Sequence, residues 1–478
     1  MHILFIYPDI LRYQGWRGVY YHGVGYLSAV LKKAGHTTTL MHVTAPMEKS
    51  FFVEKYMAEN PDLVAFSSTT NQFLYAREWM KWIKKISKET LIICGGIHTT
   101  LNPEESIATD SLDIICRGEG EQPLLELTEC IANGKSFDHI QNLWVKKING
   151  EITENPLRPI LNDLDKLPFA DREIFDFPGL CLSDGGAVFM ASRGCPFPCA
   201  YCCNHALTKI YQASMKEYVR FRSVDHIIEE IKQTLKKYTF IKNIHFDDDI
   251  LPLKRDWFRE FTHKYAEQIK VPFSCNLRAN LTNEEEGRQL KDAGCYRVQL
   301  GIESGNERIM NDVLKRGLSR EQIIRAFNLC KKAGLYTKAY NMIGLPQENM
   351  DCVLDTIELN AKCKPDVVQL SIFYPYRGTS LYDLCKEKGL LTQSEASDYL
   401  VESVLNLEDL TQDELRFTDQ FFNYLVWTFQ FIQKTPSPIS NFLRTIFRSF
   451  IKNNMVQKCI MTTYSFFLPM LRRLFSNS

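Results

Sequence analysis

The stretch from Ser192 to Asn204 carries the strongest signal in this chain, and it reads S-R-G-C-P-F-P-C-A-Y-C-C-N. Its cysteines at positions 195, 199 and 202 have the spacing C-x3-C-x2-C. Three thiolates on one tight loop can hold three irons of a cubane iron–sulfur cluster and leave the fourth iron open to a ligand. A structural zinc site normally takes four ligands in paired spacing. Cys203 and His205 could complete such a site, so zinc is the alternative to the cluster.

The composition is that of a globular, multidomain protein. A chain of 478 residues is too long for one ordinary core, so two or three domains are expected. Lys+Arg and Asp+Glu both number 57, which gives no overall bias toward nucleic acid, and we expect none as a partner. The 15 cysteines without a leader pattern argue against a disulfide scaffold and predict a reducing, cytoplasmic location.

Short apolar runs alternate with helical patterns in the first part of the chain. The predicted strands here are Ile3–Tyr7, Thr37–His42, Leu63–Ser67, Leu91–Cys94 and Ile114–Cys116. The amphipathic stretch Gly25–Ala34, which ends before Gly35, is typical of the helices between them. Strands that alternate with helices predict a doubly wound parallel sheet, whose ligands bind outside the carboxyl ends of the strands.

A second strand–helix series follows a hairpin and a connector. The hairpin covers residues 143–153 and turns at Asn149-Gly150, and the proline-rich connector covers residues 155–180. The predicted strands of the second series are Val188–Ser192, Asn243–Asp247, Pro272–Cys275, Arg297–Gly301, Tyr336–Ile343 and Val367–Ile372. Six such units predict a partial (β/α)6 barrel. After about residue 395 the pattern is helical.

The cysteine segment resembles the signature of the radical S-adenosylmethionine (SAM) superfamily, C-x3-C-x-Φ-C, and Tyr201 supplies the aromatic residue before the last cysteine. The resemblance implies that Cys195, Cys199 and Cys202 hold a catalytic [4Fe-4S] cluster, whose open iron binds SAM. One electron then cleaves SAM to methionine and a 5′-deoxyadenosyl radical. It also implies that Tyr201 packs beside the adenine and that Cys203 is not a ligand.

The same resemblance places SAM-binding residues at the ends of later strands. It assigns Glu303 and Ser304, in a G-I-E-S-G segment, to the ammonium or ribose of SAM. Gly344, in a G-L-P turn, would allow close approach of the adenine. The other candidates are Asp247 or Asp248 after the second strand, and Asn276 and Arg278 after the third. A solvated acidic turn is the alternative for the two aspartates.

The first part of the chain resembles the cobalamin-binding (B12) domain that is fused to one large class of radical SAM proteins. Three segments carry this resemblance: Gly23–His36, Cys94–Thr100 and Arg117–Glu121. The residues it assigns to cobalamin are Ser67, Thr69, Gly95, Gly96, His98, Glu119 and Gly120. The pattern D-x-H-x-x-G is absent, so His98 is only a substitute for the usual lower cobalt ligand. Hydrogen bonding to nearby backbone is its alternative role.

The predicted domains follow from these patterns. They are a B12-binding domain at 1–140, a hairpin and connector at 141–180, a radical SAM core at 181–395, and a helical C-terminal region at 396–478. No acidic residue follows Asp419, whereas Arg444, Arg448 and Lys452 repeat at helical spacing. This basic amphipathic helix predicts peripheral contact with the inner face of the membrane, or else a basic face in water.

Together these features predict a cobalamin-dependent radical SAM enzyme that methylates an unactivated carbon. The alternatives are radical cyclisation or rearrangement without methyl transfer, and a sensor that binds its cofactors without turnover. The expected partners are a small-molecule or lipid-linked substrate and a reductant such as flavodoxin or ferredoxin.

Overall fold

The structure is a computed structural model that describes residues 1–10, 16–181, 185–392 and 403–475. The chain forms two compact units. The first holds Met1–Cys275, Asp292–Gly294 and Tyr376–Ser380, and the second holds Asn276–Lys291, Cys295–Pro375 and Leu381–Ser478. No helix within these described ranges is long and apolar enough to cross a membrane.

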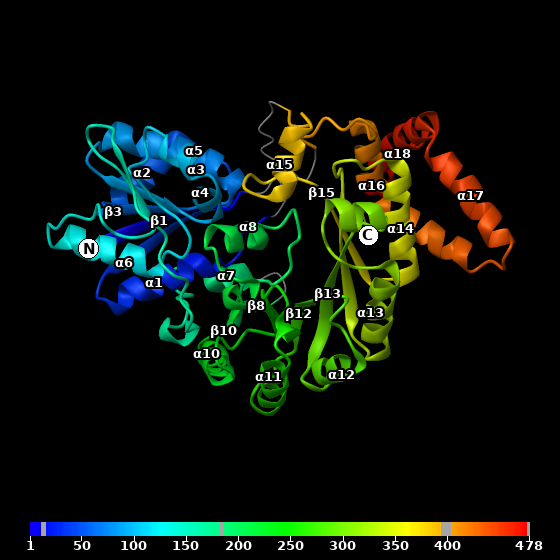
Figure 1. Ribbon diagram of the computed structural model, residues 1–478, viewed down its shortest axis with the longest axis horizontal. Coiled ribbons are helices and arrows are strands. Elements are labelled where there is room, and N and C mark those ends of the chain that lie inside the picture. Colours follow the sequence, from blue (N-terminus) through cyan, green and yellow to red (C-terminus); the bar gives the residue numbers. More distant parts are fainter. Residues whose placement is uncertain (11–15, 182–184, 393–402, 476–478) are drawn as a thin grey trace. The chain divides into compact units, whose positions relative to one another are not determined.

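The first sheet has seven strands in the order β2-β1-β3-β4-β5-β6-β7 (Figure 1). Its strands are β1 (His2–Pro8), β2 (Thr37–Val43), β3 (Leu63–Ser67), β4 (Leu91–Gly95), β5 (Ile114–Cys116), β6 (Leu143–Lys146) and β7 (Ile152–Glu154). β1 to β5 are parallel, and the antiparallel hairpin of β6 and β7 extends the sheet beside β5. The five strands predicted here are confirmed to within one residue at each end, and so is the hairpin.

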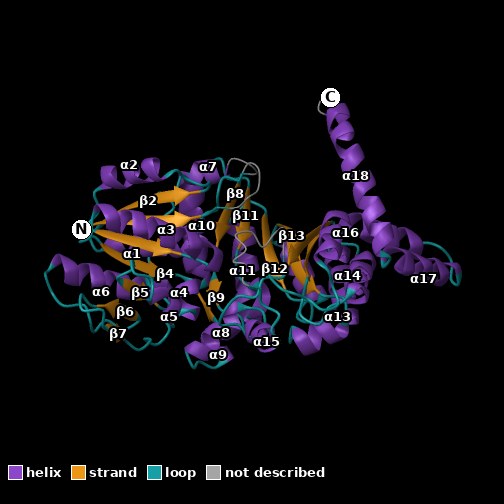
Figure 2. Cartoon of the chain, turned by 90° about the horizontal axis from the view of Figure 1, so that it is seen from above, coloured by secondary structure: helices purple, strands orange, loops and turns teal. Residues whose placement is uncertain are grey.

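Helices cover both faces of this sheet (Figure 2). They are α1 (His22–Lys33), α2 (Lys49–Glu59), α3 (Thr70–Ile86), α4 (Ile97–Leu101), α5 (Pro103–Ile107) and α6 (Glu121–Ala132). Residues 3–6 of β1 are almost wholly buried, because a parallel strand is covered on both sides. Phe52, Phe73 and Trp79 of α2 and α3 form the core on one face. The doubly wound parallel fold is therefore confirmed.

The first unit also contains the start of the second strand series. β8 (Gly186–Phe189), β11 (Asn243–Phe246) and β12 (Phe273–Leu277) run parallel, whereas β9 (Ser192–Arg193) pairs antiparallel with β10 (Arg220–Phe221). The predicted strand Val188–Ser192 is therefore broken in two. The buried Asp248 carboxylate accepts the Ala191 N–H at 3.0 Å and a short hydrogen bond from the Ser192 hydroxyl. These bonds draw the chain out of the sheet ahead of the cysteines.

The helices of this strand series are η1 (Leu164–Lys166), α7 (Phe177–Cys181), α8 (Cys203–Ile210), α9 (Met215–Tyr218), α10 (Val224–Lys237), η2 (Leu251–Leu253) and α11 (Arg255–Gln268). They are short next to the cysteines, as in α8 and α9, and longer where they connect the strands, as in α10 and α11. α10 has the expected amphipathic pattern and buries Ile227, Ile228 and Ile231.

The second unit carries the last three parallel strands, β13 (Cys295–Glu303), β14 (Tyr336–Ile343) and β15 (Val367–Ile372). Its helices are α12 (Glu284–Asp292), η3 (Ile309–Val313), α13 (Arg320–Lys332), α14 (Met350–Cys363), α15 (Ser380–Glu387), α16 (Gln412–Gln433), α17 (Ile439–Ile451) and α18 (Asn454–Phe475). The six parallel strands of the second series confirm the predicted half-barrel, and the C-terminal region is helical as predicted.

The cations of the basic stripe of α17 pair with acidic side chains of α14, although Arg444 and Lys452 remain 48% and 44% exposed. The membrane contact expected of this helix stays a prediction. Arg448 contacts Asp355 at 3.0 Å and Glu358 at 2.8 Å, and its side chain is only 18% exposed. Lys452 pairs with Asp351 at 2.6 Å. The sequence pattern showed these cations but did not indicate their partners. The partners are the acidic row of α14, which consists of Asp351, Asp355 and Glu358.

A buried carboxylate between two arginines joins the connector to the second strand series. Glu230 of α10 contacts Arg172 at 2.5 Å and forms a shorter contact with Arg222, and all three side chains are at most 5% exposed. Arg172 also donates to the Val188 carbonyl oxygen of β8.

We expect Glu230→Gln to lower the free energy of unfolding by about 3–5 kcal/mol, because it leaves two buried guanidinium groups without their counter-charge. Denaturant unfolding of the purified protein measures this loss. Glu173→Gln removes an exposed pair with Lys237 and serves as the matched control. Equal stability of the two variants would contradict the prediction.

Candidate active site

The three motif cysteines lie on the loop that joins β9 to α8. The Cys202 N–H donates to the Cys199 carbonyl oxygen at 3.1 Å, which closes a tight turn. Burial raises the pKa of the Cys195 thiol to about 12, and the neighbouring Cys202 and Cys199 thiols add to this shift. Tyr201 is half-buried on the same loop. Three converging thiols on one loop fit a cluster with one open iron.

The surroundings of the loop bear on the zinc alternative. Cys203 is the first residue of α8, and its thiol hydrogen-bonds the Cys202 thiol. Among the described residues, no three His, Cys, Asp or Glu side chains surround a point that would suit a single metal ion. The three motif cysteines therefore do not surround one common point either. A cubane cluster does not require this, because each cysteine would bind a different iron. The ligand role of the cysteines remains a prediction.

An ion-pair network ties the cysteine loop to the first sheet. Arg193, two residues before Cys195, contacts Glu119 at 2.9 Å and Glu121 at 2.6 Å. Glu119 also contacts Arg220 at 2.9 Å. Burial alone would raise the pKa of Glu119, but the two guanidinium groups hold it below its ordinary value. Glu119 was predicted to bind a cofactor, and the structure shows it as the anchor of the loop.

A cavity of about 880 Å³ lies at the carboxyl ends of the first sheet's strands, within the first unit. Six predicted cofactor residues line it: Ser67, Gly95, Gly96, Glu119, Gly120 and Asp247. Side chains from the second strand series, including Met190, Arg193 and His245, also line it. Strand ends of both series therefore open into one space.

Gly96 lines the cavity at a point where the backbone requires glycine. Its φ is +101°, and a Cβ atom there would lie 2.6 Å from the Ser68 carbonyl oxygen. Only glycine is accommodated at this position, because the Ser68 backbone lies against it. The glycine therefore allows the ends of β3 and β4 to pack closely where they border the cavity.

Two predicted cobalamin residues do not line this cavity. Thr69 begins α3, where its N–H donates to Gln72 Oε1 at 2.8 Å. His98 is buried and stacks on Phe73, with the ring centres 4.2 Å apart. Burial lowers the pKa of His98 to about 4, and its Nε2 has no hydrogen-bond partner among the described residues. A cobalamin contact from either residue remains a prediction.

His22 is a cavity residue that sequence reasoning missed. Its Nε2 lies 3.4 Å from Asp247 Oδ2, and His245 Nε2 lies 3.3 Å from Asp247 Oδ1. Burial would raise the pKa of Asp247, but the neighbouring His22 and His245 imidazoles outweigh it and lower the pKa. Asp247 therefore offers an ionised carboxylate to the cavity. His22 precedes the Gly-x-Gly of α1, and nothing in that local pattern indicates a partner so far along the chain.

The remaining SAM candidates lie in the second unit. Three of them, Arg278, Glu303 and Ser304, come together around Arg316. Arg316 joins Glu303 at 3.0 Å, and Arg278 donates to the Arg316 carbonyl oxygen. Glu303 has φ +62° beside a register shift in β13, and such strain clusters at functional sites. Ser304 is fully buried next to it, and Asn276 is half-buried. Sequence reasoning did not find Arg316.

Glu348 supports the predicted Gly-Leu-Pro turn. One of its oxygens accepts the N–H groups of Gly344 at 2.7 Å and Leu345 at 3.0 Å. Burial raises the pKa of Glu348 to about 8, although the two hydrogen bonds act against this shift. Gly344 has φ +78°, so the turn needs glycine there.

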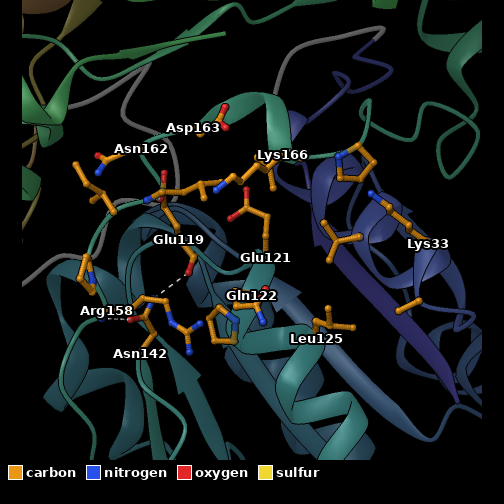
Figure 3. A pocket seen from close by; sticks show the side chains of 18 of the residues that line it. Lys33, Glu119, Glu121, Gln122, Leu125, Asn142, Arg158, Asn162, Asp163 and Lys166 are labelled. Carbon is orange, nitrogen blue, oxygen red and sulfur yellow. Dashed lines mark hydrogen bonds between the residues drawn. The ribbon is translucent and has the colours of Figure 1, made fainter. Parts of the chain in front are cut away.

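A second cavity, of about 740 Å³, shares Glu119 and Glu121 with the first as lining residues. Figure 3 shows this second cavity. Lys33 at the end of α1, Gln122 of α6 and Lys166 of the connector line it. Arg158 beside it forms an ion pair with Glu126 at 2.9 Å. This cavity contains none of the motif cysteines.

Comparison with known families agrees with this arrangement. The family model described as "Radical SAM superfamily" matches residues 190–359, and the one described as "B12 binding domain" matches residues 19–128. The first match contains the cysteine loop, and the second contains the glycine-rich strand ends of the cavity.

Two curated relatives and one solved structure extend over most of the chain. The chain is 28% identical over 400 residues to uncharacterized methyltransferase PH0819 of Pyrococcus horikoshii, covering 82% of this chain and 84% of that protein. It is 24% identical to the anaerobic magnesium-protoporphyrin IX monomethyl ester cyclase of Rubrivivax gelatinosus, covering 76% and 66%. The radical SAM methyltransferase TsrM of Kitasatospora setae has a similar fold, with TM-score 0.67, 15% identity and coverage of 85% and 80%.

The fold and the site define a radical SAM enzyme whose cysteine loop is joined to a domain of the cobalamin-binding type. The chain belongs to the radical SAM proteins that carry a B12-binding domain. The cofactors of such a protein are a [4Fe-4S] cluster, SAM and cobalamin.

We expect Glu119→Gln to reduce the iron content after anaerobic reconstitution and to lower stability by about 3 kcal/mol, because Arg193 and Arg220 lose a buried counter-charge. Iron analysis and thermal unfolding measure the two effects. Glu126→Gln, which removes the more exposed pair with Arg158, is the matched control. Normal iron content in Glu119→Gln would show that this network does not shape the loop.

We expect the stability contribution of Glu348 to fall as pH rises from about 4.3, the ordinary glutamate pKa, to about 8. In that window the unfolded chain binds fewer protons at this group than the folded chain, so rising pH favours unfolding. Glu348→Gln removes this dependence, and its melting temperature relative to wild type should rise by several degrees between pH 5 and pH 8. A constant difference across that range would refute the assigned protonation.

Proposed function

We propose that this protein transfers a methyl group to an unactivated carbon of a small molecule in a cobalamin-dependent radical SAM reaction. The observation that carries the proposal is the single cavity lined by strand ends of both series. Gly95 and Gly96 of the first sheet line the same cavity as Arg193, which lies two residues before the first cluster cysteine. The names of PH0819 and TsrM as methyltransferases support the reaction class.

When bound, the cluster and cobalamin supply one-electron cleavage of SAM and a transferable methyl group. The chain's own residues hold and shield these groups. Cys195, Cys199 and Cys202 bind three irons, and Glu303 with Arg316 offers a charged pair to the amino acid part of SAM. The strand ends would shield a bound substrate from water on the sides that they form, and such shielding protects a carbon radical from side reactions. Asp247, held between His22 and His245, orients a hydrogen-bond donor of the substrate.

Radical cyclisation without methyl transfer is a second candidate, and the relative from Rubrivivax gelatinosus favours it. This chain spans about two thirds of that cyclase. Methylation adds one carbon unit to the product, whereas cyclisation does not.

We also propose the partners and the location of the enzyme. A low-potential reductant of the flavodoxin or ferredoxin type would supply the electron. The substrate is a small molecule, free or linked to a lipid, and nucleic acid is not a substrate. The enzyme would work in the cytoplasm, with peripheral contact between its C-terminal region and the inner face of the membrane.

We expect anaerobically reconstituted protein with reductant, cobalamin and SAM carrying a deuterated methyl group to release 5′-deoxyadenosine and S-adenosylhomocysteine. Cobalamin that acquires the labelled methyl group, measured by mass spectrometry, identifies a methyltransferase. Cys199→Ala should bind at least about tenfold less iron and release no 5′-deoxyadenosine, because one iron loses its thiolate. Cys203→Ala is the control and should keep both.

Release of 5′-deoxyadenosine without S-adenosylhomocysteine would favour cyclisation. If fully reconstituted protein releases neither product, the protein is a sensor and the proposal is wrong.

A further inference from the structure

Helix α17 turns its apolar side outward. The exposed side chains are Ile439, Phe442, Leu443, Ile446 and Phe450. Phe442 is 66% exposed, Ile446 is 49% exposed and Phe450 is 50% exposed. Their spacing places all five on one stripe of the helix. We call these five side chains the apolar stripe.

The opposite side of α17 is fixed to the protein by charge and by packing. Arg444 pairs with Glu358 at 2.7 Å, alongside the contacts of Arg448 and Lys452 with α14. Phe447 packs on Phe429 of α16, with ring centres 5.2 Å apart, and Ile451 is buried. The helix therefore cannot roll to hide the apolar stripe without breaking five ion pairs with α14. Its orientation is set by the acidic row of α14.

The size of the apolar stripe argues against a second copy of the chain as its occupant. A helix of 13 residues is about 20 Å long and about 10 Å wide. Two such faces would bury roughly 400 Å², whereas stable protein interfaces bury about 1,200 Å² or more. A bilayer needs no such area, because an amphipathic helix lies in the headgroup region with only one face submerged.

Charge around the apolar stripe favours an anionic lipid surface. The sequence after Asp419 contains seven Lys or Arg residues and no Asp or Glu. Three of these seven side chains, those of Arg444, Arg448 and Lys452, form ion pairs with α14. Lys434, just before α17, is exposed, and Lys458 of α18 is exposed with its amine 3.9 Å from Asp413. Exposed cations in the segments that flank a helix with an outward apolar face match the phosphates of an anionic leaflet.

We propose that α17 is a bilayer-docking helix, which inserts the apolar stripe into an anionic membrane surface while its arginines hold the second unit. This inference rests on the peripheral membrane contact proposed above and identifies its surface. The sequence predicted membrane contact for this amphipathic helix, and the apolar stripe is the surface that would make that contact. A lipid-linked substrate would then be delivered at the surface where the enzyme docks.

Vesicle flotation of the full-length, reconstituted protein tests this proposal. Wild type should float with phosphatidylcholine vesicles that contain phosphatidylglycerol, and less with phosphatidylcholine alone. The triple variant Phe442→Gln, Ile446→Gln, Phe450→Gln should bind at least about tenfold more weakly, because it removes three apolar anchors. Its targets are exposed, so the fold should be retained.

A matched control removes three exposed apolar side chains of the first unit through Phe51→Gln, Met57→Gln and Ile148→Gln. It should float like wild type. The proposal is overturned if wild type does not float, or if the α17 variant floats equally well. A change from dimer to monomer in the α17 variant would instead make a second copy the occupant. Release of 5′-deoxyadenosine without vesicles reports separately on the proposed reaction, and all three proteins should retain it.

Discussion

The contact between Glu119 and Arg193 is the interaction on which the arrangement of the site depends. Arg193 stands two residues before the first motif cysteine, and Glu119 lies in the loop that follows β5 of the first sheet. One carboxylate therefore fixes where the cysteine loop lies relative to the glycine-rich strand ends that line the cavity. Arg220 shares the same carboxylate, so the short β9–β10 pair is held from both strands.

Parallel strands impose a second constraint, because all their carboxyl ends meet at one edge. The first sheet presents Ser67, Gly95 and Gly120 at that edge, and the second series presents Asp247 after β11. Strand ends of two different sheets thus line one cavity. The shared space is large enough for a bulky cofactor and polar enough, through Asp247 and its imidazoles, to orient a second molecule.

Much of the fold could be predicted from the sequence because its strands are nearly continuous apolar runs. Strands such as Leu63–Ser67 and Val367–Ile372 are found with the predicted bounds. The cysteine loop was also recognisable, since its spacing is local. The break in the strand at Val188–Ser192 was not predicted, because Asp248 causes it from nearly sixty residues away. His22, Arg316 and the acidic partners of Arg448 were missed for the same reason: their roles depend on contacts between distant segments.

The ion pairs around Glu119 also limit how freely the two halves of this protein can be exchanged with those of relatives. A chimera that joins the first sheet of one homologue to the strand series of another would need a carboxylate at position 119 and arginines at both 193 and 220. Without all three, the hybrid would carry an unmatched charge in a nearly closed interior. Such proteins should therefore recombine as matched pairs of halves, and their charges at these positions should change together.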